Sequence, residues 1–581
     1  MISKRRLLAA CLGLAFLYGS AVSGAQQTAK PQADDKAAQV DGQDEFVDIV
    51  NVSVVNVDVY VTDKKGNRIT GLTRDDFEIF EDGRPVAISN FYAVEDGKAV
   101  PPKGEEATAP AAPQTPGTPA PPTLERARTP EDQRLRLVVY IDNFNIHPFN
   151  RNRVMRELRA FLNEKLSRDD QVMLVSYDRS LHVRRTFTSD PGLIAAALLE
   201  LEKVSGHAVH HDSDRRDVLT RIEDSQSPNE ALSFARSYAQ SVYNDLSFSI
   251  DALKNIVDSL AGLPGRKAVL YVSDGLPMIA GQDVFYAVQN KYGTESTSLT
   301  EQFQFDTSSR FRELTSQANA NRVTFYTIDA AGLRVYSSTS AENQTAGSAG
   351  SGVFIDSIQI SNLQGTLQML AEKTGGMAII NANKVTPQLE RIAKDFNTYY
   401  SLGYSPTHYG DGRYHRIEVK LKQRTRGLQV RHREGYRDKN TEARMTDGTL
   451  AALNFPFENN PLSVEVELGK ATRRADGFYV QPVTIKIPIG KLVLVPRGQT
   501  HEARVRVFVA AADGDGNQSE VQQVLVPISI PAADLAAATG KHYTYSISLL
   551  MRGGDQKVAV GVRDDVAAES SFIARTLRVG P

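Results

Sequence analysis

The chain has 581 residues, which at the usual domain size corresponds to about three or four domains. Hydrophobic residues make up 41% and charged residues 23%, which excludes wholesale disorder, a collagen and a polytopic membrane protein. The formal net charge of −2 gives no electrostatic basis for binding nucleic acid or an anionic membrane surface.

The first residues have the layout of a secretory signal peptide. Basic residues at 4–6 precede an apolar run over 7–22, and Ala25 ends a small-residue cleavage motif. We therefore expect residues 1–25 to be removed on export to the periplasm or the exterior. The only cysteine, Cys11, ends a tetrapeptide that looks like a lipobox, so a lipid anchor and an uncleaved anchor are the alternatives. Membrane attachment is expected only through this segment.

The next part of the chain is polar, then β-rich, then rich in proline. Residues 26–45 show no apolar period, which predicts a flexible leader. Alternating valines and two glycine-containing turns, the second at Gly83, predict a small β module at 46–95. Residues 96–132 are rich in proline and alanine and predict an extended linker.

From residue 133 apolar strands alternate with amphipathic helices as far as residue 405. This order predicts a Rossmann-like α/β domain at 133–405, a doubly wound and mostly parallel sheet covered on both faces. Insertions are expected at 205–228 and 276–310. Helices are expected at 150–166, 191–202, 230–260, 311–319, 363–373 and 387–397.

The remaining chain again shows strand patterning. Residues 406–440 predict a β extension, and residues 441–581 predict a β-sandwich-like domain. The expected fold class is thus a doubly wound α/β domain flanked by N-terminal and C-terminal β-sandwich-like modules. The aspartate-rich segment 513–520 echoes a calcium loop but lacks its glycine and its last glutamate, so a hairpin turn is expected there.

Two aspartates follow predicted strands of the α/β domain. Asp142 ends the first strand and Asp274 follows a later one, and the carboxyl ends of parallel strands meet at one edge. With the strand and helix order, these positions resemble a von Willebrand factor A domain. Over 46–440 the chain resembles the VWFA-related proteins of Acidobacteria. The motifs that carry this resemblance are Gly71-Leu72-Thr73-Arg74-Asp75-Asp76-Phe77, Tyr400-Ser401-Leu402-Gly403-Tyr404 and Arg433-Glu434-Gly435-Tyr436.

The resemblance implies a metal-ion-dependent adhesion site at the rim of the sheet, where a bound ion captures an acidic residue of a partner. The family pattern is Asp-x-Ser-x-Ser, a distant threonine and a second aspartate. Phe144 and Ile146 stand where the two serines should be, and neither side chain can bind a cation. We therefore expect a degenerate site. Any ion there would be Mg²⁺ or another divalent cation, and no other cofactor is expected. The candidate ligands are Asp142, Asn145, Thr220 and Asp274.

A histidine-rich segment at 207–214 is the densest cluster of nitrogen and carboxylate groups. Its spacing favours a polar loop that contacts a partner, and zinc binding through two histidines and an aspartate is the alternative. The expected partner-binding residues are Asn143, Asn145, His147, His207, His210 and His211.

The chain contains no nucleophile elbow, phosphate loop, zinc-protease helix or dinucleotide fingerprint. We therefore expect an exported, non-catalytic protein that recognises a protein partner, in adhesion or scaffolding, through rim segments 143–148, 205–228 and 276–310. A structural component of the cell envelope, with the A domain as a spacer, is the alternative. A third reading is an unrecognised hydrolase. His147 near Asp142 is the one pair that could act as an acid and a base, although a histidine in a rim loop is more often solvated.

Overall fold

The computed structural model divides into two compact units, one ending at Arg444 and the other starting at Met445. The predicted signal peptide, leader and most of the linker lie outside the described residues. In the described part of the chain, no helix is long and apolar enough to cross a membrane. The described residues are 54–95, 97–100, 134–165, 170–334, 349–422, 427–455 and 459–580.

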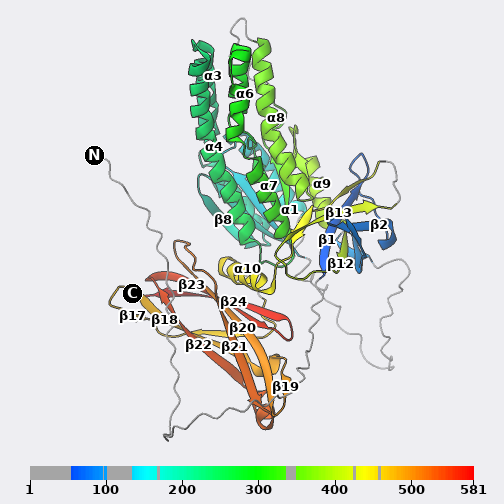
Figure 1. Ribbon diagram of the computed structural model, residues 1–581, viewed down its shortest axis with the longest axis vertical. Coiled ribbons are helices and arrows are strands. Elements are labelled where there is room, and N and C mark those ends of the chain that lie inside the picture. Colours follow the sequence, from blue (N-terminus) through cyan, green and yellow to red (C-terminus); the bar gives the residue numbers. More distant parts are fainter. Residues whose placement is uncertain are drawn as a thin grey trace, which may run out of the picture. The chain divides into compact units, whose positions relative to one another are not determined.

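A six-stranded sheet lies at the centre of the first unit (Figure 1). In spatial order its strands are β11 (Ala378–Ile379), β10 (Val323–Asp329), β9 (Arg266–Ser273), β6 (Leu135–Asp142), β7 (Gln171–Tyr177) and β8 (Leu181–Thr188). Strands β11 to β7 are parallel, and only the edge strand β8 runs antiparallel. Every residue of β6 is buried, as expected for a parallel strand covered on both faces. The predicted α/β domain with a mostly parallel sheet is confirmed.

Helices cover this sheet. Apolar side chains of α1, α2 and α9 form one core cluster with alternate residues of the strands. The residues between them are also buried, and on that side α7 and α8 contact β10. Helix α4 begins where Ser227 accepts a hydrogen bond from the backbone N–H of Glu230. The helices are α1 (Pro148–Lys165), α2 (Pro191–Glu202), α4 (Pro228–Ser259), α7 (Ser308–Ala320), α8 (Ala349–Lys373) and α9 (Thr386–Asn397).

The two expected insertions are helical and extend beyond the sheet (Figure 1). The prediction of a polar loop at 207–214 is wrong, because helix α3 begins at Ala208. Val218 and Ile222 lie one turn apart on α3 and are buried in a separate apolar cluster with α4 and α5, and this packing stabilises the helix. The added elements are α3 (Ala208–Asp224), α5 (Gln282–Tyr292) and α6 (Ser298–Glu301).

Two further sheets of the first unit share one apolar cluster and form what we term the β module. Strand β12 (Tyr399–Tyr404) pairs with β1 and β4, so it lies in this module although the sequence placed it inside 133–405. All six residues of β12 are buried, which removes the alternation that would have marked it as a module strand. The other strands are β1 (Val55–Thr62), β4 (Asn90–Glu95), β5 (Lys98–Val100) and β14 (Gln429–Arg431) in one sheet, and β2 (Phe77–Glu81), β3 (Arg84–Val86), β13 (Tyr414–Leu421) and β15 (Gly435–Arg437) in the other.

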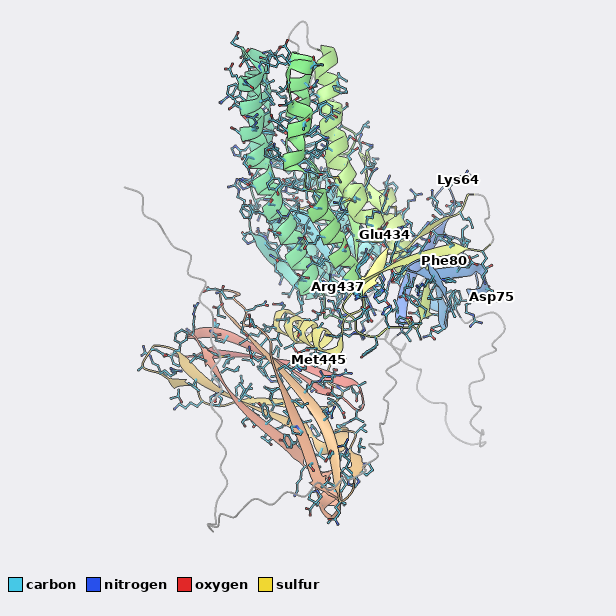
Figure 2. All side chains as sticks on the ribbon, in the orientation of Figure 1. Lys64, Asp75, Phe80, Glu434, Arg437 and Met445 are labelled. Carbon is cyan, nitrogen blue, oxygen red and sulfur yellow. The ribbon has the colours of Figure 1, made fainter. Side chains whose placement is uncertain are left out.

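A tight hairpin joins β2 to β3 in the β module. Asp82 and Gly83 both have positive φ, 49° and 79°, as a two-residue type I′ turn requires, so the turn predicted at Gly83 is confirmed. This turn directly follows Glu81, the last residue of β2, and so determines where β2 ends. Figure 2 labels Phe80 on β2 and Arg437 on β15, both in the sheet that contains β13.

The second unit contains two antiparallel sheets whose inward residues share one apolar cluster. Helix α10 (Thr441–Asn454), which the sequence did not predict, contains the division between the units. The carboxylate of Asp513 accepts hydrogen bonds from the backbone and side chain of Asn517, so this segment is the expected hairpin turn between β20 and β21. The strands are β16 (Glu465–Leu468), β17 (Thr472–Arg473), β18 (Tyr479–Pro488), β19 (Val495–Arg497), β20 (Thr500–Asp513), β21 (Gln522–Pro531), β22 (His542–Met551), β23 (Gly554–Asp564) and β24 (Glu569–Val579).

Candidate functional site

Asp142 lies at the carboxyl edge of the central sheet, at the end of β6, and is 1% exposed. Its carboxylate accepts hydrogen bonds from the Asn145 backbone (3.1 Å) and side chain (3.0 Å), from Ser273 Oγ (3.2 Å) and from the Tyr271 hydroxyl. Burial raises the pKa of Asp142, and the hydrogen bonds from Tyr271 and Asn145 oppose that shift. The carboxylate therefore holds the loop that follows its own strand.

Asp274 holds the same loop from the neighbouring strand. Its Oδ2 accepts hydrogen bonds from the backbone N–H of His147 (2.8 Å) and from Asn150 Nδ2 (3.0 Å), and its own N–H donates to the carbonyl of Asn145 (3.1 Å). Its Oδ1 is buried and has no hydrogen-bond partner among the described residues. Burial raises the pKa of Asp274 to about 6, against the lowering effect of these two donors.

The two positions that correspond to the serines of a von Willebrand factor A adhesion site are part of the core. Phe144 is 1% exposed and Ile146 is fully buried. The ring of Phe144 packs against the imidazoles of His207 and His211, with centroids 5.6 and 4.8 Å apart. Mg²⁺ requires near-octahedral oxygen ligands at about 2.1 Å, and apolar side chains supply none. The residues of this rim do not fit a magnesium site.

The other predicted residues are placed differently from one another. Asn143 is fully buried and donates to the carbonyl of Ser205 (2.8 Å), so it takes no part in an exposed surface. Thr220 is exposed on α3 and its hydroxyl donates to the carbonyl of Arg216 (3.0 Å). His210 is also exposed, and His207 Nε2 lies 2.7 Å from Asp178 Oδ1. The structure thus brings together Asp142, Asn145 and Asp274, and Thr220 does not join them.

A third aspartate at this edge was not predicted as a site residue. Asp329 ends β10, is fully buried, and pairs with Arg334 at 2.8 Å. The same guanidinium donates to the backbone carbonyl of Asp274, and Gln364 Nε2 donates to Asp329 (2.8 Å). The positively charged guanidinium group of Arg334 therefore lies beside the aspartates at this edge. Its sequence signal is that Asp329 directly follows an apolar strand, as Asp142 and Asp274 do.

A cavity of about 790 Å³ lies between this edge and the helices that extend beyond the sheet, which we term the helical extension (α3, α4, α5 and α8). Asn145, His147, Asp274 and Arg334 line it from the sheet side. Most of the charged residues that the helices contribute to its lining are acidic. Helix α3 alone contributes three aspartates and one arginine, Arg221. The charged residues from the helices are Asp212, Asp214, Asp217, Arg221, Asp245 and Asp283.

Several of these charges are already paired. Asp217 lies 2.9 Å from Arg221, and Asp283 lies 2.6 Å from Arg215. The one ion pair of Asp245 in the described part of the chain is a long contact of 3.8 Å with the exposed Arg179. Asp212 and Asp214 form no ion pair within the described ranges. The cavity consequently presents uncompensated negative charge.

Comparisons with known proteins give no family assignment. No protein-family model and no curated protein matches the chain. Similar solved structures include an aerotolerance-related membrane protein from Bacteroides fragilis (TM-score 0.23, covering 45% of this chain and 98% of that one). They also include BatB from Bacteroides thetaiotaomicron (0.22, 45% and 96%) and the manganese-loaded TRAP protein of Plasmodium vivax (0.21, 52% and 94%). Sequence identity is 10% in each case.

Replacement of Asp274 by asparagine should change how stability depends on pH. Because the folded pKa of about 6 lies above the ordinary value of 3.8, the folded protein binds this proton more tightly than the unfolded chain. Wild-type stability should therefore fall as pH rises from about 4 to 6 and stay lower above that range. We expect Asp274→Asn to lose this dependence and to gain about 1 to 3 kcal/mol relative to wild type at pH 8.

The measurement is urea unfolding of both proteins at pH 4.5, 6 and 8, followed by circular dichroism. Asp190→Asn, at the exposed cap of α2, serves as a control for an aspartate outside the cavity. A difference between Asp274→Asn and wild type that is the same at all three pH values would contradict the assignment of the raised pKa to Asp274.

Proposed function

We propose that the chain is an exported, non-catalytic recognition protein whose central domain is of the von Willebrand factor A type. It binds a protein partner through the cavity at the carboxyl edge of the sheet. The observation that carries this proposal is the cavity itself, a concave and negatively charged site of about 790 Å³ at the edge where open α/β sheets hold their ligands. Its walls come from the rim loop and from both insertions.

The charges of the cavity favour a basic partner. A complete adhesion site of this family captures an acidic residue through its metal ion, but here Phe144 and Ile146 replace the oxygen ligands. Arg334 is already paired with Asp329, whereas Asp212, Asp214 and Asp245 face the cavity with little compensation. A lysine or arginine side chain of a partner would be attracted to these carboxylates and could form charge-assisted hydrogen bonds with them.

The side chains at the rim support recognition without catalysis. Asp142 and Asp274 use their carboxylates to hold the loop after β6, and His147 contacts Asp274 through its backbone N–H. None of these contacts joins a nucleophile to a general base, which is the arrangement that covalent catalysis requires. The aspartates therefore act as scaffolding for the walls of the cavity.

The first test compares peptides of opposite charge. We expect a fluorescent lysine- and arginine-rich peptide to bind the full chain, and an aspartate- and glutamate-rich peptide of equal length not to bind. The triple variant Asp212→Asn, Asp214→Asn, Asp245→Asn should bind the basic peptide about tenfold or more weakly, since each exposed charge contributes about 0.5 kcal/mol. Fluorescence anisotropy at 50 and 200 mM salt gives both the affinity and its salt dependence.

The matched control removes three exposed aspartates of the second unit, by Asp476→Asn, Asp515→Asn and Asp534→Asn. This variant has the same change in net charge and should bind the basic peptide as wild type does. Equal weakening in both triple variants would show a general charge effect and would overturn the cavity as the binding site. A photo-crosslinking residue introduced at Ser237, which lines the cavity, should then label a partner in the native cell. The same residue introduced into the triple variant of Asp212, Asp214 and Asp245 should no longer label that partner.

A further inference from the structure

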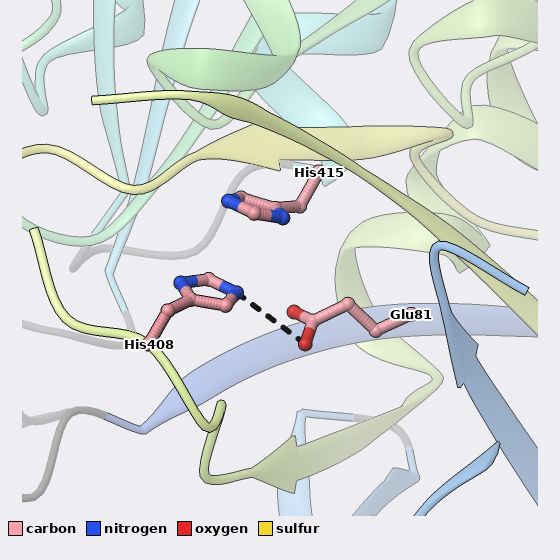
Figure 3. A group of neighbouring side chains, drawn as sticks. All are labelled: Glu81, His408 and His415. Carbon is pink, nitrogen blue, oxygen red and sulfur yellow. Dashed lines mark ion pairs between the residues drawn. The ribbon is translucent and has the colours of Figure 1, made fainter. Parts of the chain in front are cut away.

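A second polar cluster lies in the β module, away from the rim. Glu81 ends β2 and is followed by Asp82 in the hairpin turn, while His408 and Asp411 lie in the segment between β12 and β13. His415 is on β13, and Asp438 follows β15. The chain brings these groups together from positions more than 300 residues apart. Figure 3 shows the two imidazoles and the carboxylate of Glu81 side by side.

The nitrogen and oxygen atoms of this cluster converge. His408 Nε2 lies 3.4 Å from Glu81 Oε2, and His415 Nε2 lies 3.2 Å from both carboxylate oxygens of Asp411. The ligating atoms of Glu81, His408 and His415 are all within 4.8 Å of one another. Ligand atoms around a tetrahedral zinc ion with bonds of about 2.05 Å are about 3.4 Å apart, so the three groups would have to draw together around an ion.

One nitrogen of the cluster, His408 Nε2, has a contact of 3.4 Å with Glu81 but makes no hydrogen bond among the described residues. This nitrogen atom is buried. A buried polar atom without a partner costs about 1 to 3 kcal/mol. A bound cation would remove that cost, because the neutral imidazole offers its lone pair at this atom. The opposite nitrogen, Nδ1, lies 2.9 Å from Asp438, which fixes the proton there.

The surrounding contacts have the form that supports metal ligands. His415 Nδ1 lies 2.8 Å from Asp82 and its Nε2 lies 3.2 Å from Asp411, while His408 Nδ1 lies 2.9 Å from Asp438, so carboxylates orient both histidines. Histidines that bind zinc usually have this second hydrogen bond, which sets the tautomer and the ring orientation. Glu81 Oε1 accepts hydrogen bonds from the hydroxyls of Tyr404 (2.7 Å) and Tyr436 (2.8 Å), and its other oxygen faces His408.

The charge of the cluster also favours a dication. Four carboxylates surround two imidazoles, and Arg444 approaches Asp438 at 3.5 Å. Two imidazole nitrogens and one carboxylate suit zinc, whereas Mg²⁺ and Ca²⁺ prefer oxygen alone. We propose that Glu81, His408 and His415 bind one Zn²⁺ ion, with the carboxylates of Asp411 and Asp438 as supporting neighbours of the two histidines. The ion would link the hairpin of β2 and β3 to the chain that returns through β12 and β13.

The test uses the full-length protein after treatment with a chelator. On addition of Zn²⁺ and removal of the excess, mass spectrometry of the metal content should find one zinc per chain in wild type. Isothermal titration should show an affinity that falls about 100-fold or more in His408→Ala and His415→Ala. Asp438→Asn, which removes an orienting carboxylate, should cost about 10- to 100-fold. Cobalt should give the visible absorption of a tetrahedral site.

Controls separate metal binding from folding. His182→Ala and His542→Ala each remove an exposed histidine from outside the cluster and should bind zinc as wild type does. Asp411→Asn is the variant that keeps folding intact, because this residue is exposed in a loop, and it should still weaken zinc binding. The proposal is overturned if wild type retains no zinc, or if Asp411→Asn and His408→Ala bind zinc as tightly as His182→Ala does.

Discussion

Replacing Arg215 by methionine should lower the free energy of unfolding of the first unit by about 3 to 5 kcal/mol. Arg215 on α3 lies 2.6 Å from Asp283 on α5 and 3.1 Å from Asp356 on α8. All three side chains are less than a tenth exposed. The variant leaves the buried carboxylate of Asp283 without this counterion and removes one partner of Asp356, and a buried charge that loses its counterion is much more costly than the pair it came from.

A matched variant on the same helix tests whether burial decides the effect. Arg221→Met removes an arginine that pairs with Asp217 at 2.9 Å, where both side chains are more than half exposed, and should cost less than about 1 kcal/mol. Urea unfolding followed by circular dichroism measures both variants. If Arg215→Met costs no more than Arg221→Met, the buried triad does not hold the helical extension together.

A triple variant separates the effect of charge from that of packing. Adding Asp283→Asn and Asp356→Asn to Arg215→Met removes both buried negative charges while keeping similar side-chain volumes. We expect this variant to recover a large part of the lost stability, because neutral amides cost less to bury than unpaired carboxylates. A triple variant that unfolds as easily as Arg215→Met would instead assign the loss to packing around position 215.

The helical extension also shows where the sequence is informative. Long periodic segments such as 191–202 and 230–260 were predicted as helices and agree with α2 and α4. Residues 207–214, which include the first part of α3, were predicted as a polar loop because they are rich in histidine and aspartate. Arg215 on this helix is buried with partners that lie about 70 and 140 residues further along the chain. Local patterns cannot show that a charged residue will be neutralised by such distant groups.

The residues of the candidate sites also differ in how far they could be predicted from the sequence. Asp142 and Asp274 could be assigned to one edge because each follows an apolar strand, and parallel strands end at the same side. The role of Tyr271 could not be predicted, since a tyrosine inside a buried strand gives no sign that its hydroxyl reaches Asp142. No local sequence pattern marks the proposed zinc cluster. Glu81 and His408 are far apart in the sequence, and the pairing of β12 with β1 and β4 places them in the same module.

Asp395→Asn should destabilise the first unit by about 3 to 5 kcal/mol through a second buried ionic contact. Asp395 on α9 is fully buried, and its carboxylate accepts hydrogen bonds from Arg431 on β14 (3.0 and 2.9 Å) and from the hydroxyl of Tyr326 on β10 (3.2 Å). It also pairs with Arg68. One carboxylate therefore connects the α/β domain to two positions of the β module.

The two arginines explain why a neutral asparagine is not sufficient. The pKa of Arg68 is lowered to about 10, first by burial and then by the positive charge of Arg431. The guanidinium groups thus repel each other, and Asp395 is the counterion that keeps both in place. In Asp395→Asn that repulsion is no longer balanced, so the β module should loosen from the α/β domain before either loses its own core.

Two measurements distinguish this loosening from general destabilisation. Glu390→Gln changes an exposed carboxylate on the same helix and should unfold as wild type does. In Asp395→Asn, hydrogen exchange should accelerate at β14 and β1 before β6 and β9, and adding Arg431→Gln should restore part of the stability because it removes one of the repelling charges. Uniform acceleration across all four strands would show that Asp395 supports the core of the α/β domain and does not act as a link.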